Sequence, residues 1–384
     1  MSRKISHWFP FILIFLSFGV LLHACSLVSK PEIKIGIIAP LTGEYAETTG
    51  QPAVDAAQMA VDEVNEAGGL DVAGERYTIS LVVEDNAGNP EKSVSAAQKL
   101  INQEGVVAIV GPLFSSNAIP VAEVSEKAGI PMISPTSTNL QTTADKRYVF
   151  RATFVDDFQA LAMARFALGE LGIQEAAVLY DVASAYNQGL AQAFQQAYEA
   201  AGGQIVAFES YTTDQNQNFS DQLAAIQASA AAALFLPNYT DDVLLQGQQA
   251  RAMGIDAIIL GSDSWEGERL SVSEAFENAF FSGHFCRDMS VPAVRDFSER
   301  YEAAYSREPN GLIALTYDSI GLLFAAMQNQ GQVSPEVIRD GLYAVDYKGL
   351  TGVIGYEDNG DPIKSVAIWH IEAGDRNCYK MVNP

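Results

Sequence analysis

The chain has 384 residues, and its 47 acidic and 23 basic side chains give a formal net charge of −24. Because so negative a protein repels polyanions, we expect it to bind neither nucleic acid nor an anionic membrane surface by electrostatic attraction. Hydrophobic residues make up 48% of the sequence, which excludes a disordered acidic tail. At about 150 residues per domain, the length predicts two folded domains.

The first 25 residues have the pattern of a bacterial lipoprotein signal. Arg3 and Lys4 precede an apolar run from Trp8 to Leu22, which is shorter than the about 20 residues that a transmembrane helix needs. Ala24 then precedes Cys25, the residue whose thiol would carry lipid after cleavage.

This pattern predicts a signal peptide over residues 1–24 and a lipidated tether over residues 25–32. The rest of the chain would then work outside the cytoplasmic membrane and contact the membrane through the lipid alone. The alternatives are an ordinary signal peptide, or an uncleaved membrane anchor in which the cysteine is incidental.

Beyond the tether, apolar strands alternate with amphipathic helices. The segment 33–39 is almost purely apolar, as expected of a parallel strand covered on both faces. Pro52 suits the first turn of the next helix, and Gly68 and Gly69 would end that helix. Further strands are predicted over 77–83, 106–110, 131–134 and 148–153, and further helices over 91–102 and 118–127.

A second series of strands and helices follows the first. Strands are predicted over 176–180, 204–208, 232–236 and 257–260, with helices that include 187–201 and 242–253. Two or three helices follow Met289, and short strands fill 352–381. Because strands that alternate with helices of 10–15 residues form βαβ units, the predicted fold class is α/β, with two doubly wound parallel-sheet lobes.

Compact polar turns follow three of the predicted strands, where an open α/β sheet binds its ligands. A Ser-Ser turn at a helix start offers hydroxyl and free N–H groups to an anion such as a carboxylate. Asp263 could pair with a cation, and Tyr186 and Tyr239 would line the opposite wall. This pattern suits a small zwitterion in a cleft, although each turn could also be a plain helix cap. The turns are Gly111–Asn117, Ser134–Thr138 and Gly261–Trp265.

The order and spacing of several short motifs resemble the type I periplasmic solute-binding proteins of the branched-chain amino acid (Leu/Ile/Val) class. The similarity covers nearly the whole chain after Cys25. The motifs include Ile33-Lys34-Ile35-Gly36, Pro40-Leu41-Thr42-Gly43, Asn65-Glu66-Ala67-Gly68-Gly69, Glu84-Asp85-Asn86, Ile133-Ser134-Pro135, Tyr186-Asn187-Gln188-Gly189 and Gly360-Asp361-Pro362.

The resemblance implies a Venus-flytrap fold, in which two lobes joined by three crossovers close on a ligand. Lobe 1 would comprise residues 33–153 and 286–349, and lobe 2 residues 154–285 and 350–384. The implied function is that of the lipid-anchored, extracytoplasmic substrate-binding component of an ABC importer, which passes a small amino acid to the permease. We expect a monomer. The alternative is a receptor module of the same fold that senses amides, urea or aromatic acids.

The resemblance also implies a set of ligand contacts. They are Ser115 and Thr138 for the α-carboxylate, the Thr136 carbonyl and Asp263 for the ammonium, Tyr186 and Tyr239 over the ligand, and Asp156 at a lobe crossover. One departure concerns the cleft floor, where related proteins often have an aromatic residue and this chain has Thr48, with Tyr45 three residues earlier. The identity of the ligand side chain is therefore not predicted.

Few other residues point to chemistry. Cys286 and Cys378 could form a disulfide in an oxidising compartment or stay as two buried thiols. The sequence has four histidines and no H-E-x-x-H or C-x-x-C motif, so we expect no metal and no cofactor. It also has no G-x-S-x-G and no P-loop, so we expect no enzyme. His284 is expected to be a local structural histidine, and Trp265 could line the pocket or pack locally.

Overall fold

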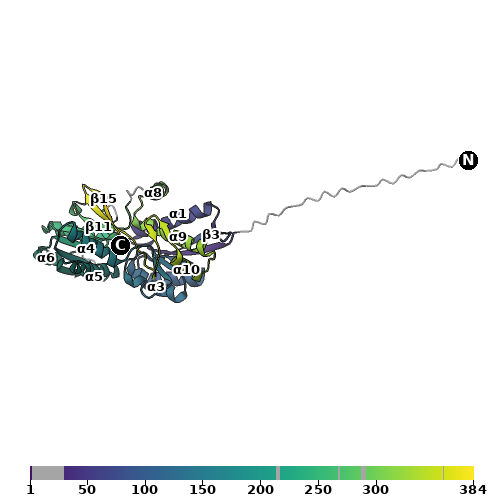
Figure 1. Ribbon diagram of the computed structural model, residues 1–384, viewed down its shortest axis with the longest axis horizontal. Coiled ribbons are helices and arrows are strands. Elements are labelled where there is room, and N and C mark those ends of the chain that lie inside the picture. Colours follow the sequence, from purple (N-terminus) through teal and green to yellow (C-terminus); the bar gives the residue numbers. More distant parts are fainter. Residues whose placement is uncertain (2–29, 213–216, 267–268, 287–290, 358) are drawn as a thin grey trace. The chain divides into compact units, whose positions relative to one another are not determined.

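Two large β-sheets, each covered by helices on both faces, account for most of the described part of the chain (Figure 1). This computed structural model describes residue 1 and residues 30–212, 217–266, 269–286, 291–357 and 359–384. Residues 31–384 form one compact unit. The predicted signal peptide and Cys25 lie outside the described residues.

The first sheet has six strands in the order β2-β3-β1-β4-β5-β6, and all neighbours are parallel except β2 and β3. Its strands are β1 (Glu32–Ala39), β2 (Leu70–Val72), β3 (Glu75–Asp85), β4 (Ala108–Val110), β5 (Met132–Ser134) and β6 (Val149–Arg151). Its helices are α1 (Gln51–Glu66), α2 (Pro90–Lys99), α3 (Ser115–Ala128), α8 (Pro292–Tyr305), α9 (Gly311–Gln330) and α10 (Pro335–Ala344).

The apolar run in β1 is buried on both faces, as its sequence predicts. Ile33, Ile35 and Ile37 pack with residues of α1, α9 and α10, whereas Ile38 packs with residues of α2 and α3. This alternation follows from the two-residue period of a strand. We refer to the first sheet and its helices as lobe 1.

The second sheet has seven strands in the order β15-β14-β11-β10-β9-β7-β8, of which β14 and β15 run antiparallel to their neighbours. Its strands are β7 (Glu175–Asp181), β8 (Gln204–Tyr211), β9 (Ala233–Leu236), β10 (Ile258–Gly261), β11 (Phe280–Gly283), β14 (Val366–Glu372) and β15 (Asp375–Val382). Its helices are α4 (Asp156–Gly169), α5 (Ala185–Ala200), α6 (Ser220–Ser229) and α7 (Thr240–Ala252). We refer to this sheet and its helices as lobe 2.

Helices α4 and α5 pack on one face of the second sheet, and α6 and α7 pack on the other. Figure 1 shows α1, α9 and α10 grouped around the first sheet and α4, α5 and α6 around the second. The α/β fold class with two doubly wound lobes is therefore confirmed.

Three crossovers connect the lobes, after β6, after β11 and before β14. The first and third crossovers lie against each other and are connected by hydrogen bonds. The buried guanidinium of Arg151 donates from Nε to Asp361 Oδ1 at 2.6 Å. Lys364, also buried, donates to the carbonyl of Ala152 at 2.9 Å. These polar contacts hold the crossovers together in the interior of the molecule.

The packing of the third crossover bears on the predicted lobe boundary at residue 350. A small two-stranded sheet, β12 (Tyr347–Gly349) and β13 (Gly352–Ile354), precedes this crossover. Ile354 and Tyr356 pack in the core of lobe 1, whereas Val366 begins β14 of lobe 2. This packing favours a boundary between Tyr356 and Val366.

Most predicted elements are present within a few residues of their expected ends, but some elements were not predicted. Strands β2, β11 and β12 and helix α4 are additional, and α6 lies between two predicted strands where no bounds had been given. Helix α3 begins at Ser115 rather than at the predicted Ala118, since Phe114 takes the extended conformation of an N-cap residue. Ser115 therefore lies in the first turn of the helix.

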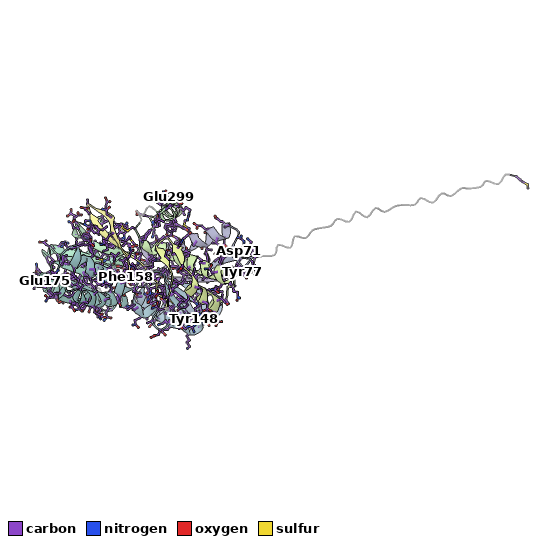
Figure 2. All side chains as sticks on the ribbon, viewed as in Figure 1. Asp71, Tyr77, Tyr148, Phe158, Glu175 and Glu299 are labelled. Carbon is purple, nitrogen blue, oxygen red and sulfur yellow. A yellow bond between two sulfur atoms is a disulfide. The ribbon has the colours of Figure 1, made fainter. Side chains whose placement is uncertain are left out.

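Helix α9 is the one helix among the described residues that is long and apolar enough to cross a membrane. Of its apolar window, 72% is buried inside the structure, so it is a core helix of lobe 1. Side chains surround both sheets (Figure 2), and exposed acids such as Glu175 and Glu299 contribute to the negative charge of the surface. Cys286 is bonded to Cys378 of β15, with Cα atoms 5.6 Å apart.

Candidate functional site

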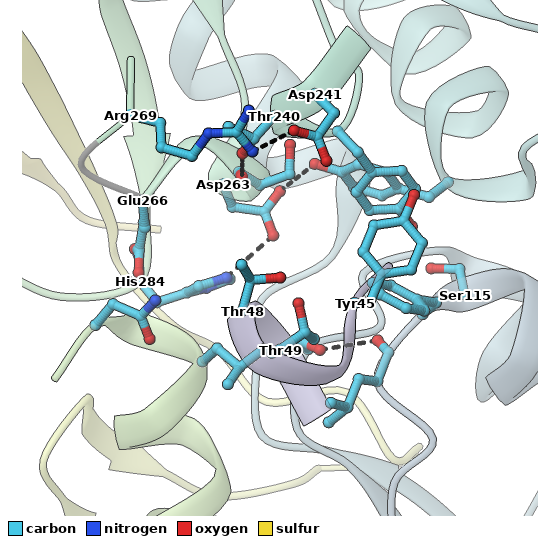
Figure 3. A pocket seen from close by; sticks show the side chains of 18 residues that line it. Tyr45, Thr48, Thr49, Ser115, Thr240, Asp241, Asp263, Glu266, Arg269 and His284 are labelled. Atoms are coloured by element: carbon cyan, nitrogen blue, oxygen red, sulfur yellow. Dashed lines mark hydrogen bonds and ion pairs between the residues drawn. The ribbon is translucent and has the colours of Figure 1, made fainter. Parts of the chain in front are cut away.

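A cavity of about 180 Å³ lies between the lobes, next to the carboxyl ends of strands from both sheets (Figure 3). Because a cavity of about 150 Å³ can hold benzene, this one has room for a ligand the size of a small amino acid. Lobe 1 lines it with Tyr45, Thr48, Thr49, Leu113, Phe114, Ser115, Thr136, Asn310 and Leu312. Lobe 2 lines it with Tyr186, Tyr239, Thr240, Asp241, Asp263, Ser264, Glu266, Arg269 and His284.

The lobe 1 wall contains the first turn of α3. Ser115, 2% exposed, accepts a hydrogen bond from Ser137 Oγ at 2.9 Å. The turn before α3 requires Gly111, whose φ is +94° and whose place a side chain could not take without colliding with the Ile38 carbonyl. Thr136 donates from Oγ1 to the Leu113 carbonyl at 2.8 Å. This wall therefore presents a hydroxyl and the free N–H groups of a helix N-terminus, which suit an anion.

The lobe 2 wall is centred on Asp263, which is 9% exposed and follows β10. Tyr186 donates from its hydroxyl to Asp263 Oδ1 at 2.6 Å, and His284 Nε2 lies 3.0 Å from Asp263 Oδ2. Figure 3 shows the contact between His284 and Asp263 as a dashed line. Burial, followed by the charge of Asp263, raises the pKa of Tyr186 well above its ordinary value, so this hydroxyl stays a donor.

The charges in the cavity favour a cationic group beside Asp263. Arg269 is the one arginine or lysine among the described lining residues, and it forms an ion pair with Asp241. Three carboxylates, those of Asp241, Asp263 and Glu266, line the cavity together with this single guanidinium. Because the Asp263 carboxylate can accept more hydrogen bonds than it receives, an ammonium group could bind there.

Aromatic rings from both lobes form one side of the cavity. Tyr45 and Phe114 of lobe 1 lie 4.9 Å apart between ring centroids, and Phe114 lies 5.3 Å from Tyr239 of lobe 2. Tyr186 stacks on Tyr239 at 5.3 Å. This wall would exclude water from an apolar part of a ligand.

The structure brings together five of the predicted ligand residues, namely Ser115, Thr136, Tyr186, Tyr239 and Asp263. Thr138 and Asp156 are buried and do not line the cavity.

Asp156 begins α4 and is connected to Thr138 through the backbone, since its N–H donates to the Thr138 carbonyl at 3.0 Å. Neither of its carboxylate oxygens has a hydrogen-bond partner among the described residues, and burial raises its pKa to about 7. The roles of Asp156 and Thr138 toward a ligand stay predictions.

Sequence reasoning missed several lining residues. His284 was expected to be a local structural histidine, and it does contact Thr153 Oγ1 at 3.1 Å, but it also faces the cavity beside Asp263. Glu266 and Asn310 were not singled out. Asn310 could have been noticed, because it precedes an apolar helical run as an N-cap residue and accepts from Ile313 N–H at 3.2 Å.

The sequence allowed Trp265 either to line the pocket or to pack locally, and in the structure it packs locally. It is fully buried in the lobe 2 core, 5.4 Å from the ring of Phe276. Within the described ranges, no group of three or more His, Cys, Asp or Glu side chains is placed to hold a metal ion.

Comparisons with known proteins agree with this geometry. A family model described as periplasmic binding protein matches residues 32–376. A leucine-, isoleucine-, valine-, threonine- and alanine-binding protein of Pseudomonas aeruginosa is 25% identical over 379 residues, covering 94% of this chain and 96% of the relative.

Two solved structures cover 92% of the chain. The leucine-binding protein LivK of Thermotoga maritima has a TM-score of 0.84 and 31% identity, with 99% of its own chain covered. The branched-chain amino acid transporter substrate-binding protein LivJ of Streptococcus pneumoniae, in complex with isoleucine, has a TM-score of 0.83 and 30% identity, with 100% covered. The chain therefore belongs to the periplasmic binding protein family, in the type I class of two-lobed proteins, whose members bind solutes and are not enzymes.

Proposed function

We propose that this protein is the extracytoplasmic substrate-binding component of an ABC importer and that it binds a small α-amino acid between its lobes. The observation that carries the proposal is the position of Asp263. Its carboxylate is 9% exposed, faces the cavity, and has a tyrosine and a histidine as its partners there. The first turn of α3 lines the same cavity from the other lobe. A zwitterion fits one anion-binding and one cation-binding wall.

In the proposed complex, the α-carboxylate binds the Ser115 hydroxyl and free N–H groups at the start of α3. The ammonium binds Asp263 and the Thr136 carbonyl, and Tyr186 and Tyr239 cover the ligand. Thr138 and Asp156 support these contacts from behind the wall. The names of the relatives, which bind leucine, isoleucine, valine, threonine or alanine, support an amino acid ligand.

Binding to both walls would couple the ligand to the angle between the lobes. A ligand that contacts lobes 1 and 2 together stabilises the arrangement in which both walls are in reach. The permease of the importer would recognise that arrangement. The same protein would be held at the membrane by lipid on Cys25, which the residues around that cysteine favour.

The binding function can be tested by a thermal-shift screen of residues 31–384 with the twenty amino acids, urea, short amides and aromatic acids. A ligand at 100 times its Kd should add about 2.7 kcal/mol to the free energy of unfolding. We expect hits among small or branched amino acids. Hits confined to amides, urea or aromatic acids would contradict the amino acid assignment and support the sensory alternative.

Lipid anchoring has its own test. In cells, the wild-type chain should be recovered with membranes and should incorporate labelled fatty acid, whereas Cys25→Ser should do neither. Membrane recovery of the C25S variant without label would instead indicate an uncleaved anchor.

A further inference from the structure

Glu266 connects the turn that carries Asp263 to the first turn of a helix in the opposite lobe. It follows the short helical turn Asp263–Trp265 in lobe 2 and is 8% exposed. Its Oε2 accepts a hydrogen bond from the backbone N–H of Gly311, the first residue of α9 in lobe 1. Its Oε1 accepts from the backbone N–H of His284 at 2.7 Å. We call these two hydrogen bonds the Glu266 bridge.

The bridge uses the electrostatics of a helix N-terminus across the two lobes. The N–H of Gly311 has no partner within α9, because the first four N–H groups of a helix never do, and the helix dipole favours a negative group there. Asn310 caps Ile313 of the same turn, so the two side chains divide the free donors between them. A 20-residue helix of lobe 1 thus receives one of its caps from lobe 2.

Two glycines leave the space that the carboxylate occupies. A Cβ atom added to Gly311 would collide with the carboxylate oxygens of Glu266. A Cβ atom added to Gly283 would lie 2.7 Å from Glu266 Oε1, also too close. The backbone of Glu266 is fixed as well, because Arg376 of β15 donates to its carbonyl oxygen.

Backbone N–H groups are the hydrogen-bond donors to the Glu266 carboxylate. None of the described lysine or arginine side chains forms an ion pair with Glu266; Arg376 binds its carbonyl instead. A buried carboxylate is costly unless it is hydrogen-bonded, so separation of Gly311 from Glu266 would lose this bond and require water to take its place at both groups. The arrangement with both hydrogen bonds formed is therefore favoured over one in which the lobes move apart here.

The bridge is also joined to the ligand cavity. Glu266 and His284 both line the cavity, and His284 contacts Asp263 Oδ2 through its ring while its N–H donates to Glu266. Asp263 and Glu266 are three residues apart in one turn. We propose that Glu266 is a positioning residue, which holds the Asp263 turn at the start of α9 and favours the arrangement of the lobes that binds ligand. This inference rests on the proposed binding function.

The test uses two variants that weaken the Glu266 bridge from opposite lobes. Glu266→Gln replaces one carboxylate oxygen with an NH2 group, which cannot accept, so the bridge keeps at most one of its two hydrogen bonds, and Gly311→Ala displaces the carboxylate without changing it. Matched controls are Glu274→Gln, an exposed glutamate of lobe 2, and Gly169→Ala, a helical glycine with open space around it. Each is made in residues 31–384, which form one compact unit with their own cores.

Two readouts are compared well below the unfolding temperature of each variant. Small-angle X-ray scattering without ligand should give a larger radius of gyration for E266Q and G311A than for wild type. Calorimetric titration with leucine should give at least a tenfold higher Kd for both. The double variant should lose little more affinity than the more affected single variant, because both act through the Glu266 bridge.

Wild-type radius of gyration and wild-type leucine affinity in E266Q and G311A would overturn the inference, even if both variants unfold at lower temperature. Additive losses in the double variant would overturn it too. If the wild-type protein itself does not bind leucine, the proposed ligand fails, and the scattering of the ligand-free variants still decides on the Glu266 bridge.

Discussion

Asp263 is the residue on which the proposed binding of an amino acid depends most. It is nearly buried, and it is held by Tyr186 at 2.6 Å and His284 at 3.0 Å, so its carboxylate is fixed toward the cavity. A fixed carboxylate in a desolvated site attracts an ammonium group far more strongly than a solvated one does.

Asp263→Asn should therefore weaken leucine binding by about 2–5 kcal/mol, since the bound ammonium would lose its charged partner in a desolvated site. The side-chain volume hardly changes, so the fold should be retained. The measurement is calorimetric titration, with Asp157→Asn, an exposed aspartate of α4, as the control. Equal affinity in wild type and D263N would remove Asp263 from the proposed site.

Asp156 makes stability depend on pH. Burial raises its pKa from an ordinary value near 3.8 to about 7. Between these values the folded state keeps a proton that the unfolded state loses, so the free energy of unfolding falls as pH rises from about 4 to about 7. The shift corresponds to a change of up to about 4 kcal/mol in the free energy of unfolding over this pH range.

Asp156→Asn, which mimics the protonated carboxyl, should remove that part of the pH dependence. Urea unfolding at pH 4.5 and pH 7.5 should show that the stability of D156N relative to wild type is greater at the higher pH. In the control variant D157N the difference from wild type should be the same at both values. A D156N difference that is independent of pH would show that Asp156 is not protonated in the fold.

Sequence alone could predict some of the individual site residues. Ser115, Thr136 and Asp263 follow predicted strands, so their place at a sheet edge follows from the α/β pattern. His284 follows β11, a strand that was not predicted, Asn310 lies beyond the second crossover, and Glu266 belongs to a turn whose outer contacts come from the other lobe. No local pattern encodes a contact between segments so distant in sequence.

Among the elements, helix α1 and strand β3 are joined by one side chain. Strand β2 pairs with β3 only as far as Tyr77, so the next backbone groups on that edge are open. Asn65 occupies this place, since its Nδ2 donates to the Ile79 carbonyl at 2.8 Å and its Oδ1 accepts from the Ile79 N–H at 2.9 Å. The Asn65 amide thus pairs with the backbone edge of β3 beyond the point where β2 ends.

Asn65→Ala should lower the free energy of unfolding by about 1–3 kcal/mol, because both backbone groups of the buried Ile79 would lose their partner. Urea unfolding measures the change. Glu66→Ala, at the exposed end of the same helix, is the control and should change stability little. A loss in N65A no larger than in E66A would mean that water replaces the amide without cost.

The sequence also predicted the elements unevenly, for physical reasons. Long apolar strands such as β1 are buried on both faces and are recognisable from composition alone. Strands β2 and β11 are short, and their pairing depends on partners elsewhere in the chain, so their own residues carry little signal. The same applies to the start of α3, where an extended Phe114 decided the boundary.

At the scale of the whole molecule, the disulfide Cys286–Cys378 connects the second crossover to the last strand of lobe 2. It closes a separation of 92 residues. In the chain-entropy view, a loop of this length corresponds to a stabilisation of about 4–5 kcal/mol.

Unreduced protein of residues 31–384 should therefore contain no alkylatable thiol by mass spectrometry, and reductant should lower its unfolding temperature. The double variant C286A/C378A should unfold at a lower temperature than wild type and should not respond to reductant. Two alkylated cysteines in the unreduced wild type would show free thiols instead.

The cavity between the lobes is proposed to bind an α-amino acid through both of its charges. Calorimetric titration of residues 31–384 with leucine and with 4-methylpentanoate, which lacks only the ammonium, measures what the ammonium contributes. We expect leucine to bind and the acid to bind at least about 30-fold more weakly, because a desolvated Asp263 would lose its partner. Equal or tighter binding of the acid would show that the ammonium is not recognised in this cavity.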